Sequence, residues 1–383
     1  MSAIGILSII GLAMVAIPTT IALVNVRRLK RAAPAADCPD SEALVSCCIP
    51  ARDEAGNLEA CVRSLLDGGH QRIEVLVYDD ESTDETPAIL ARLGEEDPRV
   101  RAVGTRPLPE GWNGKQHACQ RMGEAAEGSW LLFTDADVRF ERGWLRRTLS
   151  ETRDRPRLGL LSAFPHELTG SIGEALFVPM IHVLLLGYLP MRGMRTTLQP
   201  AASAGCGQFL FVRREAWTES GGHAAFRDSM HDGIKLPRSI RTAGWQSDLV
   251  DGTDLCRCRM YHGFMESFRG FAKNGYEGLG SIWILLLITV IHLVGHLLPF
   301  GVLAWCLATG TWLEVATPIS IASVVMMLGL RTVLAVRYRQ APIGVPLHPV
   351  AVLATTVMQW WSLRLHLRGT RSWRGRTTSP SGG

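Results

Sequence analysis

The sequence has little excess charge of either sign and no cysteine spacing typical of a metal site. Its 40 lysines and arginines nearly balance 36 aspartates and glutamates, which leaves a net charge of +4 over 383 residues. That excess is too small to indicate nucleic-acid binding, so we expect no nucleic-acid partner. The nine cysteines are scattered, and Cys256 and Cys258 lack a second pair of ligands. We expect reduced thiols in a cytoplasmic domain.

Charged residues are also missing from the two ends of the chain. None occurs between Ala3 and Val24, and few occur between Ser281 and Arg331. Uncharged stretches of this length are typical of membrane-spanning helices. The sequence therefore predicts a transmembrane anchor over residues 1–30, a globular domain over 41–275, a C-terminal transmembrane region over 281–366 and a basic tail over 367–383.

Basic residues indicate how these segments are oriented. A basic group that begins at Arg27 and ends at Arg31 follows the first apolar stretch, residues 4–26, and no basic residue precedes that stretch. Basic flanks normally lie on the cytoplasmic side, and a signal peptide would carry its charges first. We therefore expect an uncleaved anchor rather than a signal peptide cut near residues 33–36, with the globular domain in the cytoplasm.

Three further apolar segments create a conflict in the topology. They are residues 282–307, 315–336 and 345–363. Three crossings would carry the basic tail outside, against the positive-inside rule. We expect one segment to be re-entrant or interfacial, and His292, His296 and Pro318 make the first two the suspects.

A shorter apolar stretch lies inside the globular domain. Residues 175–189 are interrupted by Pro179 and His182 and are too few to cross a bilayer. The stretch predicts a buried or interfacial helix within residues 172–190.

Short apolar runs alternate with amphipathic helices through the first half of the globular domain. The runs cover residues 43–49, 73–78, 100–103, 130–133 and 158–162, and the helical patterns cover 58–66, 86–93 and 114–126. This alternation predicts a parallel sheet with helices on both faces. Ligands bind beyond the carboxyl ends of the strands in such sheets, and polar clusters at 52–54, 79–80 and 135–137 fall there.

The cluster at residues 135–137 is the strongest candidate for a metal site. Asp135 and Asp137 follow an apolar strand, and Mg²⁺ typically takes one or two carboxylates together with substrate phosphates. A metal held there would neutralise a diphosphate leaving group. The alternative is an ordinary Asp-rich turn.

Two other groups suit a nucleotide. Asp79 and Asp80 can accept hydrogen bonds from a base or ribose, although Ser82, Thr83 and Asp84 after them also predict a helix cap. Lys115 opens a helix whose N-terminus suits an anion, but the spacing around it is not that of a P-loop. An exposed lysine is the alternative.

The remaining candidates lie further along the chain. Gly205, Gly207 and Gln208 precede the apolar stretch 209–212, where glycines permit close approach to a ligand or a bulge. Asp232 begins a helix and can act as a base toward an acceptor hydroxyl, or merely cap the helix.

Together these residues resemble the family 2 glycosyltransferases. The motifs that carry the resemblance are residues 49–54 (IPARDE), 79–84 (DDESTD), Gly114 with Lys115, 134–137 (TDAD), 205–208 (GCGQ) and Asp232. The resemblance implies an α/β fold of the GT-A type, a Rossmann-like and mostly parallel sheet, with transmembrane helices at both ends. Residues 111–115, 270–274 and 373–376 look most like membrane-bound hopene-associated and carotenoid-type lipid glycosyltransferases.

The resemblance also implies a role for each site residue. Pro50, Ala51, Arg52, Glu54, Asp79 and Asp80 would hold the nucleoside, with Lys115, Gly207, Gln208 and Arg259 also on the donor side. Asp135 and Asp137 would bind Mg²⁺ or Mn²⁺ and the diphosphate. Asp232 would be the base of a single displacement that inverts the anomeric centre.

Two departures from the family pattern affect this interpretation. The family usually has Glu-Asp where this chain has His231 and Asp232. The Gln-x-x-Arg-Trp motif of processive synthases is absent, and residues 256–261 are only a distant counterpart, with Arg259 near the diphosphate.

We therefore expect an integral protein of a bacterial inner or plasma membrane that moves one sugar from a nucleotide-sugar donor to a lipid or polyprenyl-type acceptor. A processive polysaccharide synthase, a non-catalytic nucleotide-sugar-binding protein and a transporter are the alternatives.

Overall fold

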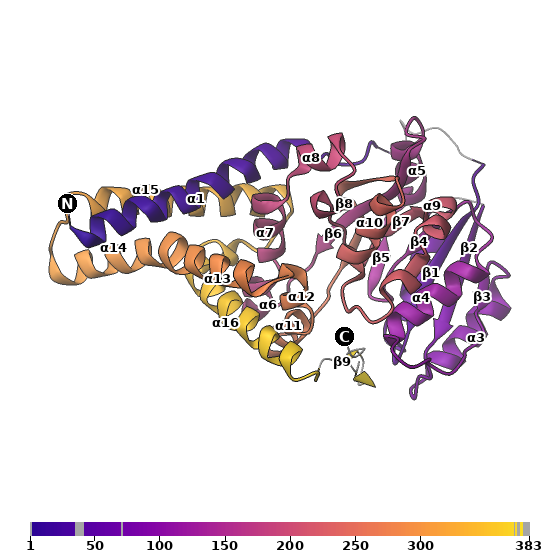
Figure 1. Ribbon diagram of the computed structural model, residues 1–383. Helices are drawn as coiled ribbons and strands as arrows, with labels where there is room; N and C mark the ends of the chain where they lie inside the picture. The colour runs from indigo at the N-terminus through magenta and orange to yellow at the C-terminus, as the bar shows by residue number, and fades with distance from the viewer. Residues whose placement is uncertain (1, 35–41, 70–71, 371, 374–375, 378–383) are drawn as a thin grey trace. The chain divides into compact units, whose positions relative to one another are not determined.

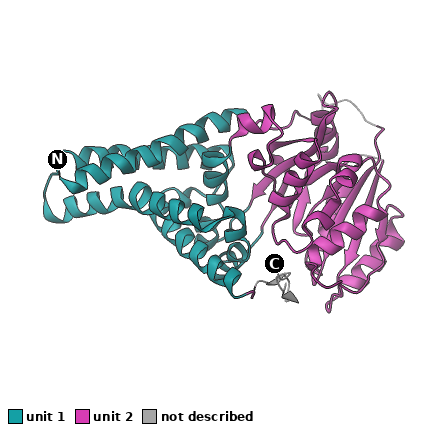
Figure 2. Ribbon diagram, viewed as in Figure 1, with its two compact units in different colours: residues 1–28, 168–189, 260–368 teal, residues 29–167, 190–259, 369–383 magenta. Residues whose placement is uncertain are grey.

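The structure, a computed structural model, describes residues 2–34, 42–69, 72–370, 372–373 and 376–377. The chain divides into two compact units (Figure 2). A helical unit contains residues 1–28, 168–189 and 260–368, and a sheet unit contains 29–167, 190–259 and 369–383. Residues 168–189 and 260–275, which we placed in the globular domain, thus pack with the helical unit. Most of the basic tail lies outside the described residues.

The sheet unit is built on eight strands (Figure 1). They are β1 (Val45–Ala51), β2 (Ile73–Asp79), β3 (Val100–Ala102), β4 (Trp130–Phe133), β5 (Val138–Phe140), β6 (Leu158–Glu167), β7 (Leu210–Arg213) and β8 (Gln246–Cys258). Their order is β3-β2-β1-β4-β7-β6-β8-β5. The first four strands are mutually parallel, β6 is parallel to β8, and β7 and β5 run antiparallel to their neighbours.

Seven α-helices of the described chain belong to this unit. They are α2 (Leu58–Leu66), α3 (Thr86–Glu96), α4 (Gly114–Ala125), α5 (Trp144–Thr152), α8 (Met191–Thr196), α9 (Arg214–Glu219) and α10 (Asp232–Thr242) among the described residues. Every residue of β1 is buried, as expected for a strand covered on both faces. Leu76, Met122, Leu131 and Leu236 belong to one core cluster that joins strands to α4 and α10. The predicted alternation of strands and helices is confirmed.

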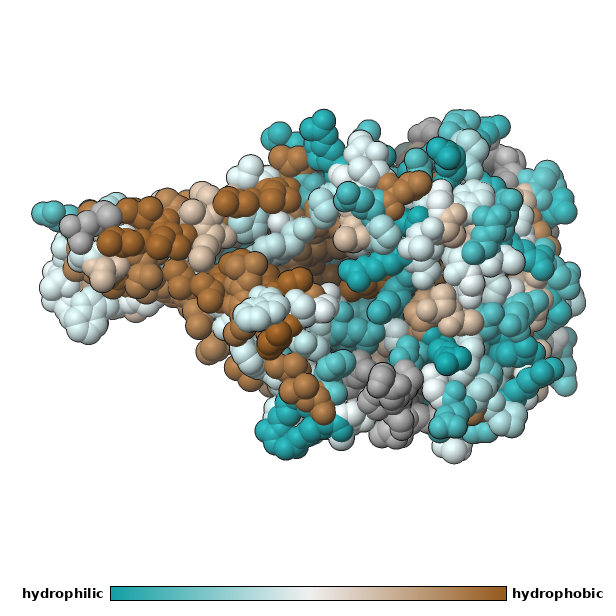
Figure 3. All heavy atoms as spheres, in the orientation of Figure 1, coloured by the Kyte–Doolittle hydropathy of each residue, from teal (hydrophilic) through white to brown (hydrophobic). Residues whose placement is uncertain are grey.

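The helical unit contains long and short helices. They are α1 (Ala3–Arg28), α6 (Ile172–Phe177), α7 (Met180–Tyr188), α11 (Phe264–Ala272), α12 (Gly275–Leu279), α13 (Ile282–Val290), the π-helix η4 (Ile291–Leu297), α14 (Leu298–Thr309), α15 (Ala316–Arg337) and α16 (His348–Leu367). Figure 3 shows hydrophobic residues gathered over the outside of this unit.

Three helices of the described chain are long and apolar enough to cross a membrane. They are α1, the continuous helix Ile282–Thr309, and α15. The third C-terminal segment, now α16, is not among them, and it carries His348, Gln359, Arg364 and His366. We therefore expect the third segment, rather than either of the first two, to be the one that does not cross the membrane.

The histidines that made the first segment a suspect have polar partners. His292 Nδ1 lies 2.7 Å from Thr356 Oγ1, and His296 Nδ1 lies 3.0 Å from His348 Nε2. A buried polar group in a membrane helix is tolerated when another helix supplies its partner.

The short apolar stretch is buried within the helical unit. It forms α6 and α7, which are separated next to Pro179. Asn25 on α1 donates hydrogen bonds of 2.8 Å to the carbonyl oxygens of Leu186 and Leu189. These contacts agree with the buried helix, and the interfacial helix stays a prediction.

Candidate functional site

The loops that follow β1 and β2 are joined by hydrogen bonds. Asp53 N donates to Ser82 Oγ over 2.9 Å, and Thr83 N donates to Asp53 Oδ1 over 2.8 Å. Asp53 and Glu81 have positive φ of 53° and 55°, a conformation that non-glycine residues rarely adopt. These cross-loop bonds hold both loops in place at the carboxyl ends of their strands.

This arrangement changes the role of the residues predicted to cap α3. Asp84 Oδ1 does accept from Thr86 N over 2.9 Å. Ser82 and Thr83 instead bond to Asp53, and the N-cap of α3 is Glu85, which makes no side-chain cap hydrogen bond. The predicted cap is not formed because tertiary structure brings the Ser82 and Thr83 hydroxyls to Asp53, where they form hydrogen bonds with the neighbouring loop.

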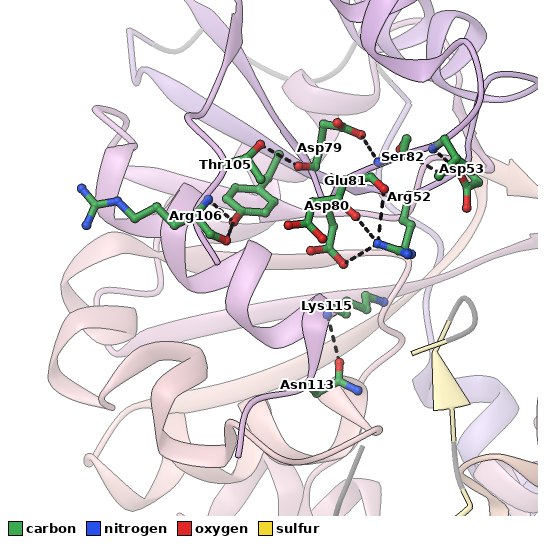
Figure 4. A network of polar contacts seen from close by, with 12 residues as sticks. Arg52, Asp53, Asp79, Asp80, Glu81, Ser82, Thr105, Arg106, Asn113 and Lys115 are labelled. Carbon is green, nitrogen blue, oxygen red and sulfur yellow. Dashed lines mark hydrogen bonds and ion pairs between the residues drawn. The ribbon is translucent and has the colours of Figure 1, made fainter. Parts of the chain in front are cut away.

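Arg52 and Asp80 form the centre of the paired loops (Figure 4). The Arg52 guanidinium donates to the backbone oxygens of Asp80 and Glu81, and its Nη1 lies 3.7 Å from Asp80 Oδ2. Asp80 is almost fully buried. The guanidinium thereby holds the backbone of the loop and places its charge near the Asp80 carboxylate.

The loop after β3 is attached to the same edge. Thr105 Oγ1 donates to the backbone oxygen of Asp79 over 2.8 Å, and Arg106 N donates to the Tyr78 hydroxyl over 2.9 Å. Asp79 Oδ1 accepts from Ser82 N over 3.3 Å. Predicted nucleoside residues from two strands therefore lie on one braced edge of the sheet, and Pro50 and Ala51 are the last two residues of β1, both buried.

Lys115 connects the predicted metal site to the predicted base. Its Nζ lies 2.6 Å from Asp135 Oδ1 and 2.9 Å from Asp232 Oδ2. Asn113 caps α4 by accepting from Lys115 N over 3.0 Å, which fixes where the side chain begins (Figure 4). Lys115 is thus neither an exposed lysine nor isolated from other charges.

The two ion pairs set the charge states of these groups. Burial alone would lower the pKa of Lys115, but Asp135 and Asp232 outweigh burial and raise it well above its usual range. Burial alone would raise the pKa of Asp232, but the Lys115 ammonium holds it below its usual range. Lys115 is therefore charged and Asp232 ionised at neutral pH.

Asp232 lies in the first turn of α10, and the N-cap is His231. Besides Lys115, the Asp232 carboxylate accepts from Gly233 N over 2.7 Å. The helix-cap alternative is therefore not what the structure shows. His231 donates its backbone N–H to Ser229 Oγ over 3.0 Å.

Asp137, two residues after Asp135, is partly buried, and its carboxyl has a perturbed pKa. Burial, together with the charges of Asp135 and Glu54, raises the pKa of Asp137 to about 7. Its Oδ1 is buried and makes no hydrogen bond to any residue that the structure describes. A carboxylate oxygen without a hydrogen-bond donor fits a divalent cation, whose charge would offset the repulsion of Asp137 by Asp135 and Glu54.

The described residues contain no group of three or more histidine, cysteine or acidic side chains arranged around one metal ion. Asp135 and Asp137 would therefore hold a cation only together with other ligands. Mg²⁺ fits this requirement, because it usually completes its shell with water and substrate phosphates.

The glycines at 205 and 207 pack against the start of α10. A Cβ on Gly207 would meet Asp232 Oδ1 at 2.5 Å, and a Cβ on Gly233 would meet the Gly205 oxygen at 2.6 Å. Close approach was one of our two alternatives, but the group approached here is the Asp232 carboxylate. Any side chain at 207 would displace that carboxylate.

Gln208 braces the sheet beneath Asp137. Its Nε2 donates to Cys258 Sγ over 3.0 Å, and its backbone oxygen accepts from Thr134 Oγ1 over 2.7 Å. Its side chain is buried, so its observed contacts are with protein. Arg259 comes directly after β8 and is half-buried.

Glu167, the last residue of β6, is a site neighbour that the sequence did not reveal. Both carboxylate oxygens are buried and make no hydrogen bond within the described chain. Burial and the charge of Asp137 raise the pKa of Glu167 well above its usual range. No motif surrounds it, and only an acidic residue after a long apolar run could have indicated it.

The acidic residues at these strand ends can bind an anionic ligand only together with cations. Asp80, Asp135, Asp137 and Asp232 come from β2, β4 and α10, and Arg52 and Lys115 are ion-paired to three of them. A ligand with a diphosphate would compete for the same ammonium and guanidinium groups. The arrangement therefore suits a phosphorylated ligand that brings a divalent cation.

Comparisons with known proteins agree with this chemistry. Residues 46–217 match the sequence model of Glycosyl transferase family 2. The 4,4'-diaponeurosporenoate glycosyltransferases of Staphylococcus aureus strains USA300 and MRSA252 are 26% identical over 239 residues, 61% of this chain. The match spans 61% of the length of these relatives.

A solved structure shares the fold. The mannosyltransferase PcManGT from Pyrobaculum calidifontis, in complex with GDP-Man and Mn²⁺, gives a TM-score of 0.56 at 18% identity. The superposition covers 93% of this chain and 99% of that chain. The predicted GT-A fold is confirmed, and residues 46–217 are similar in sequence to glycosyl transferase family 2.

Proposed function

We propose that this protein transfers a single sugar from a nucleotide-sugar donor to a lipid or polyprenyl-type acceptor at the cytoplasmic face of a membrane. The observation that carries the proposal is the pairing of Lys115 with both Asp135 and Asp232. This pairing joins a group suited to the leaving diphosphate with a group suited to the acceptor.

On the donor side, the braced loops are proposed to hold the nucleoside. Arg52 and Asp80 form a fixed pair there, and Asp79 lies beside them. Asp135 and Asp137 are proposed to hold Mg²⁺ or Mn²⁺, which would neutralise charge on the diphosphate. The buried Asp137 Oδ1 without a hydrogen bond supports this assignment.

On the acceptor side, Asp232 is proposed to take the proton of the attacking hydroxyl as the sugar inverts. Its low pKa in the ion pair makes it a weak base. A donor diphosphate that draws Lys115 away would remove the ion pair and raise the pKa of Asp232. Lys115 would then strengthen the base only when the donor is bound.

The three membrane-length helices support a cytoplasmic site. With α1, Ile282–Thr309 and α15 crossing, the sheet unit and α16 lie on the same side of the membrane. The basic residues after α1 and near the end of α16 then share that side, as the positive-inside rule requires. The proposed topology would avoid the conflict created by three C-terminal crossings.

The acceptor class rests on the diaponeurosporenoate glycosyltransferases, whose name gives a carotenoid-type acceptor. A transfer assay on the detergent-purified chain tests the proposal, with UDP-, GDP- and dTDP-sugars, Mn²⁺ and membrane lipid extract. We expect one donor to release its nucleotide faster when lipid is added and to stop when the metal is chelated. Donor binding without turnover in every mixture would overturn the enzyme assignment.

A further inference from the structure

Helix α16 buries its polar side and exposes its apolar side, the reverse of a helix in water. Its buried side carries His348, Thr355, Thr356, Gln359 and Ser362. Its exposed side carries Leu353, 52% exposed, and Val357, 53% exposed, with Val350, Trp360 and Trp361 along the same stripe. A helix in water buries the apolar side, so this exposed stripe suits lipid.

Three residues of the buried polar side have hydrogen-bond partners in other parts of the helical unit. His348 and Thr356 pair with His296 and His292, and Ser362 Oγ accepts from Tyr276 N over 2.8 Å. These contacts fix which side of α16 faces outward. Figure 1 shows α16 running obliquely to α1 and α15 rather than alongside them. An oblique helix with an apolar outer side is suited to the membrane interface.

The C-terminal end of this outer side forms a cationic groove. Trp360, Leu363, Arg364, Leu367 and Arg368 line an open groove of about 300 Å³. The Arg364 guanidinium carbon lies 5.1 Å from the centre of the Trp361 ring. Within the described chain neither arginine forms an ion pair, so two guanidinium charges lie beside apolar surface without a carboxylate.

We propose that this groove binds the headgroup phosphate of an anionic phospholipid, with its acyl chains along the exposed stripe of α16. The charge complements a phosphate, which a guanidinium can hold with two parallel hydrogen bonds. Tryptophans are enriched at the headgroup level of membranes, which places Trp360 and Trp361 at the boundary between phosphate and acyl chain. Lipid supplies both the anion and the apolar part, which a free phosphate does not.

The test is lipid retention by the full-length protein in detergent, measured by native mass spectrometry. Phosphatidylglycerol and phosphatidylcholine with identical acyl chains are titrated separately. We expect preferential binding of phosphatidylglycerol, weakened about tenfold or more in the double variant Arg364→Gln/Arg368→Gln. The matched control is Arg142→Gln/Arg153→Gln, which removes the same charge from exposed positions of the sheet unit and should leave binding unchanged.

Two further outcomes decide the proposal. The variant Arg364→Lys/Arg368→Lys keeps the charge without the planar fork, so it should bind phosphatidylglycerol more weakly than wild type and more strongly than the Gln variant. Equal binding of phosphatidylglycerol by wild type and the Gln variant would overturn the lipid site. Displacement of the lipid by millimolar inorganic phosphate would assign the groove to a free anion and would also overturn it.

Discussion

Lys115 shares one ammonium group between Asp135 and Asp232, which we assign to opposite sides of the reaction. Both ion pairs are close, at 2.6 and 2.9 Å, so the ammonium group can bind a diphosphate only if one of the two pairs loosens. Loosening the pair with Asp232 would raise the pKa of that carboxyl. At the scale of single residues, donor binding and base strength are therefore linked through one side chain.

The raised pKa of Asp137 predicts how the metal affinity of the site depends on pH. Because its pKa is raised to about 7, a proton occupies this carboxyl increasingly as the pH falls below 7, and a metal ion must displace it. We expect the half-saturating Mn²⁺ concentration to rise by up to about tenfold between pH 7 and pH 6, and to change little above pH 8. A Mn²⁺ titration of donor binding at each pH measures this. A half-saturating concentration that stays constant from pH 6 to pH 8 would contradict it.

The raised pKa of Glu167 predicts that replacing this buried carboxyl with a neutral amide stabilises the folded protein. Burial raises its folded-state pKa, so the folded protein binds this proton more tightly than the unfolded chain does. The free energy of unfolding therefore falls as the pH rises above about 4.3, the unfolded value, toward the folded pKa. We expect Glu167→Gln to stabilise the detergent-purified protein by about 1–3 kcal/mol at pH 8, measured by thermal unfolding. A lower melting temperature for the variant would instead indicate a hydrogen bond that the Glu167 carboxyl makes.

At the scale of elements, the contact between the 205–208 segment and α10 positions Asp232. Because a Cβ at position 207 would meet Asp232 Oδ1 at 2.5 Å, Gly207→Ala must move the carboxylate. We expect a loss of turnover of about a hundredfold with little change in donor affinity, since the base contributes to the chemical step. The matched control is Gly329→Ala on α15, where a Cβ meets nothing within 4 Å. Equal turnover in both variants would show that Asp232 tolerates the shift.

Local sequence patterns predict the elements of the sheet only where burial and apolarity coincide. The runs that became β1 to β4 are apolar and buried, so their pattern is visible. Strand β8 was missed because it buries Asp248, whose carboxylate pairs with Arg155 at 2.7 Å and Arg195 at 2.9 Å. These partners lie 93 and 53 positions away, so no local window contains them.

The same reason limits what the sequence shows of the site. Asp135, Asp137, Lys115 and Asp232 were each identified from local motifs. The bridge that Lys115 makes between β4 and α10 depends on long-range packing, and no spacing indicates it. The role of α16 was also hidden, because its polar residues lower the hydropathy of a helix whose exposed side is apolar.

At the scale of the whole molecule, the proposed topology predicts opposite locations for the two termini. Three crossings place the N-terminus outside and the C-terminus in the cytoplasm. A fluorescent protein that folds only in the cytoplasm should therefore fluoresce when fused after residue 383 and stay dark when fused before residue 1. An alkaline phosphatase fusion, active only outside, should give the reverse pattern. A dark C-terminal fluorescent fusion with an active C-terminal phosphatase would mean that α16 also crosses.

Turnover and donor binding by Asp232→Asn, measured side by side with wild type, test the central claim most directly. Asparagine keeps the size of the side chain but cannot take a proton, so we expect turnover to fall by about 10²–10⁴-fold. Donor affinity should stay within a few-fold, and Asp154→Asn, an exposed acid of the same unit, should behave as wild type. Unchanged turnover in Asp232→Asn would contradict the account, because the proton would then be taken by another group.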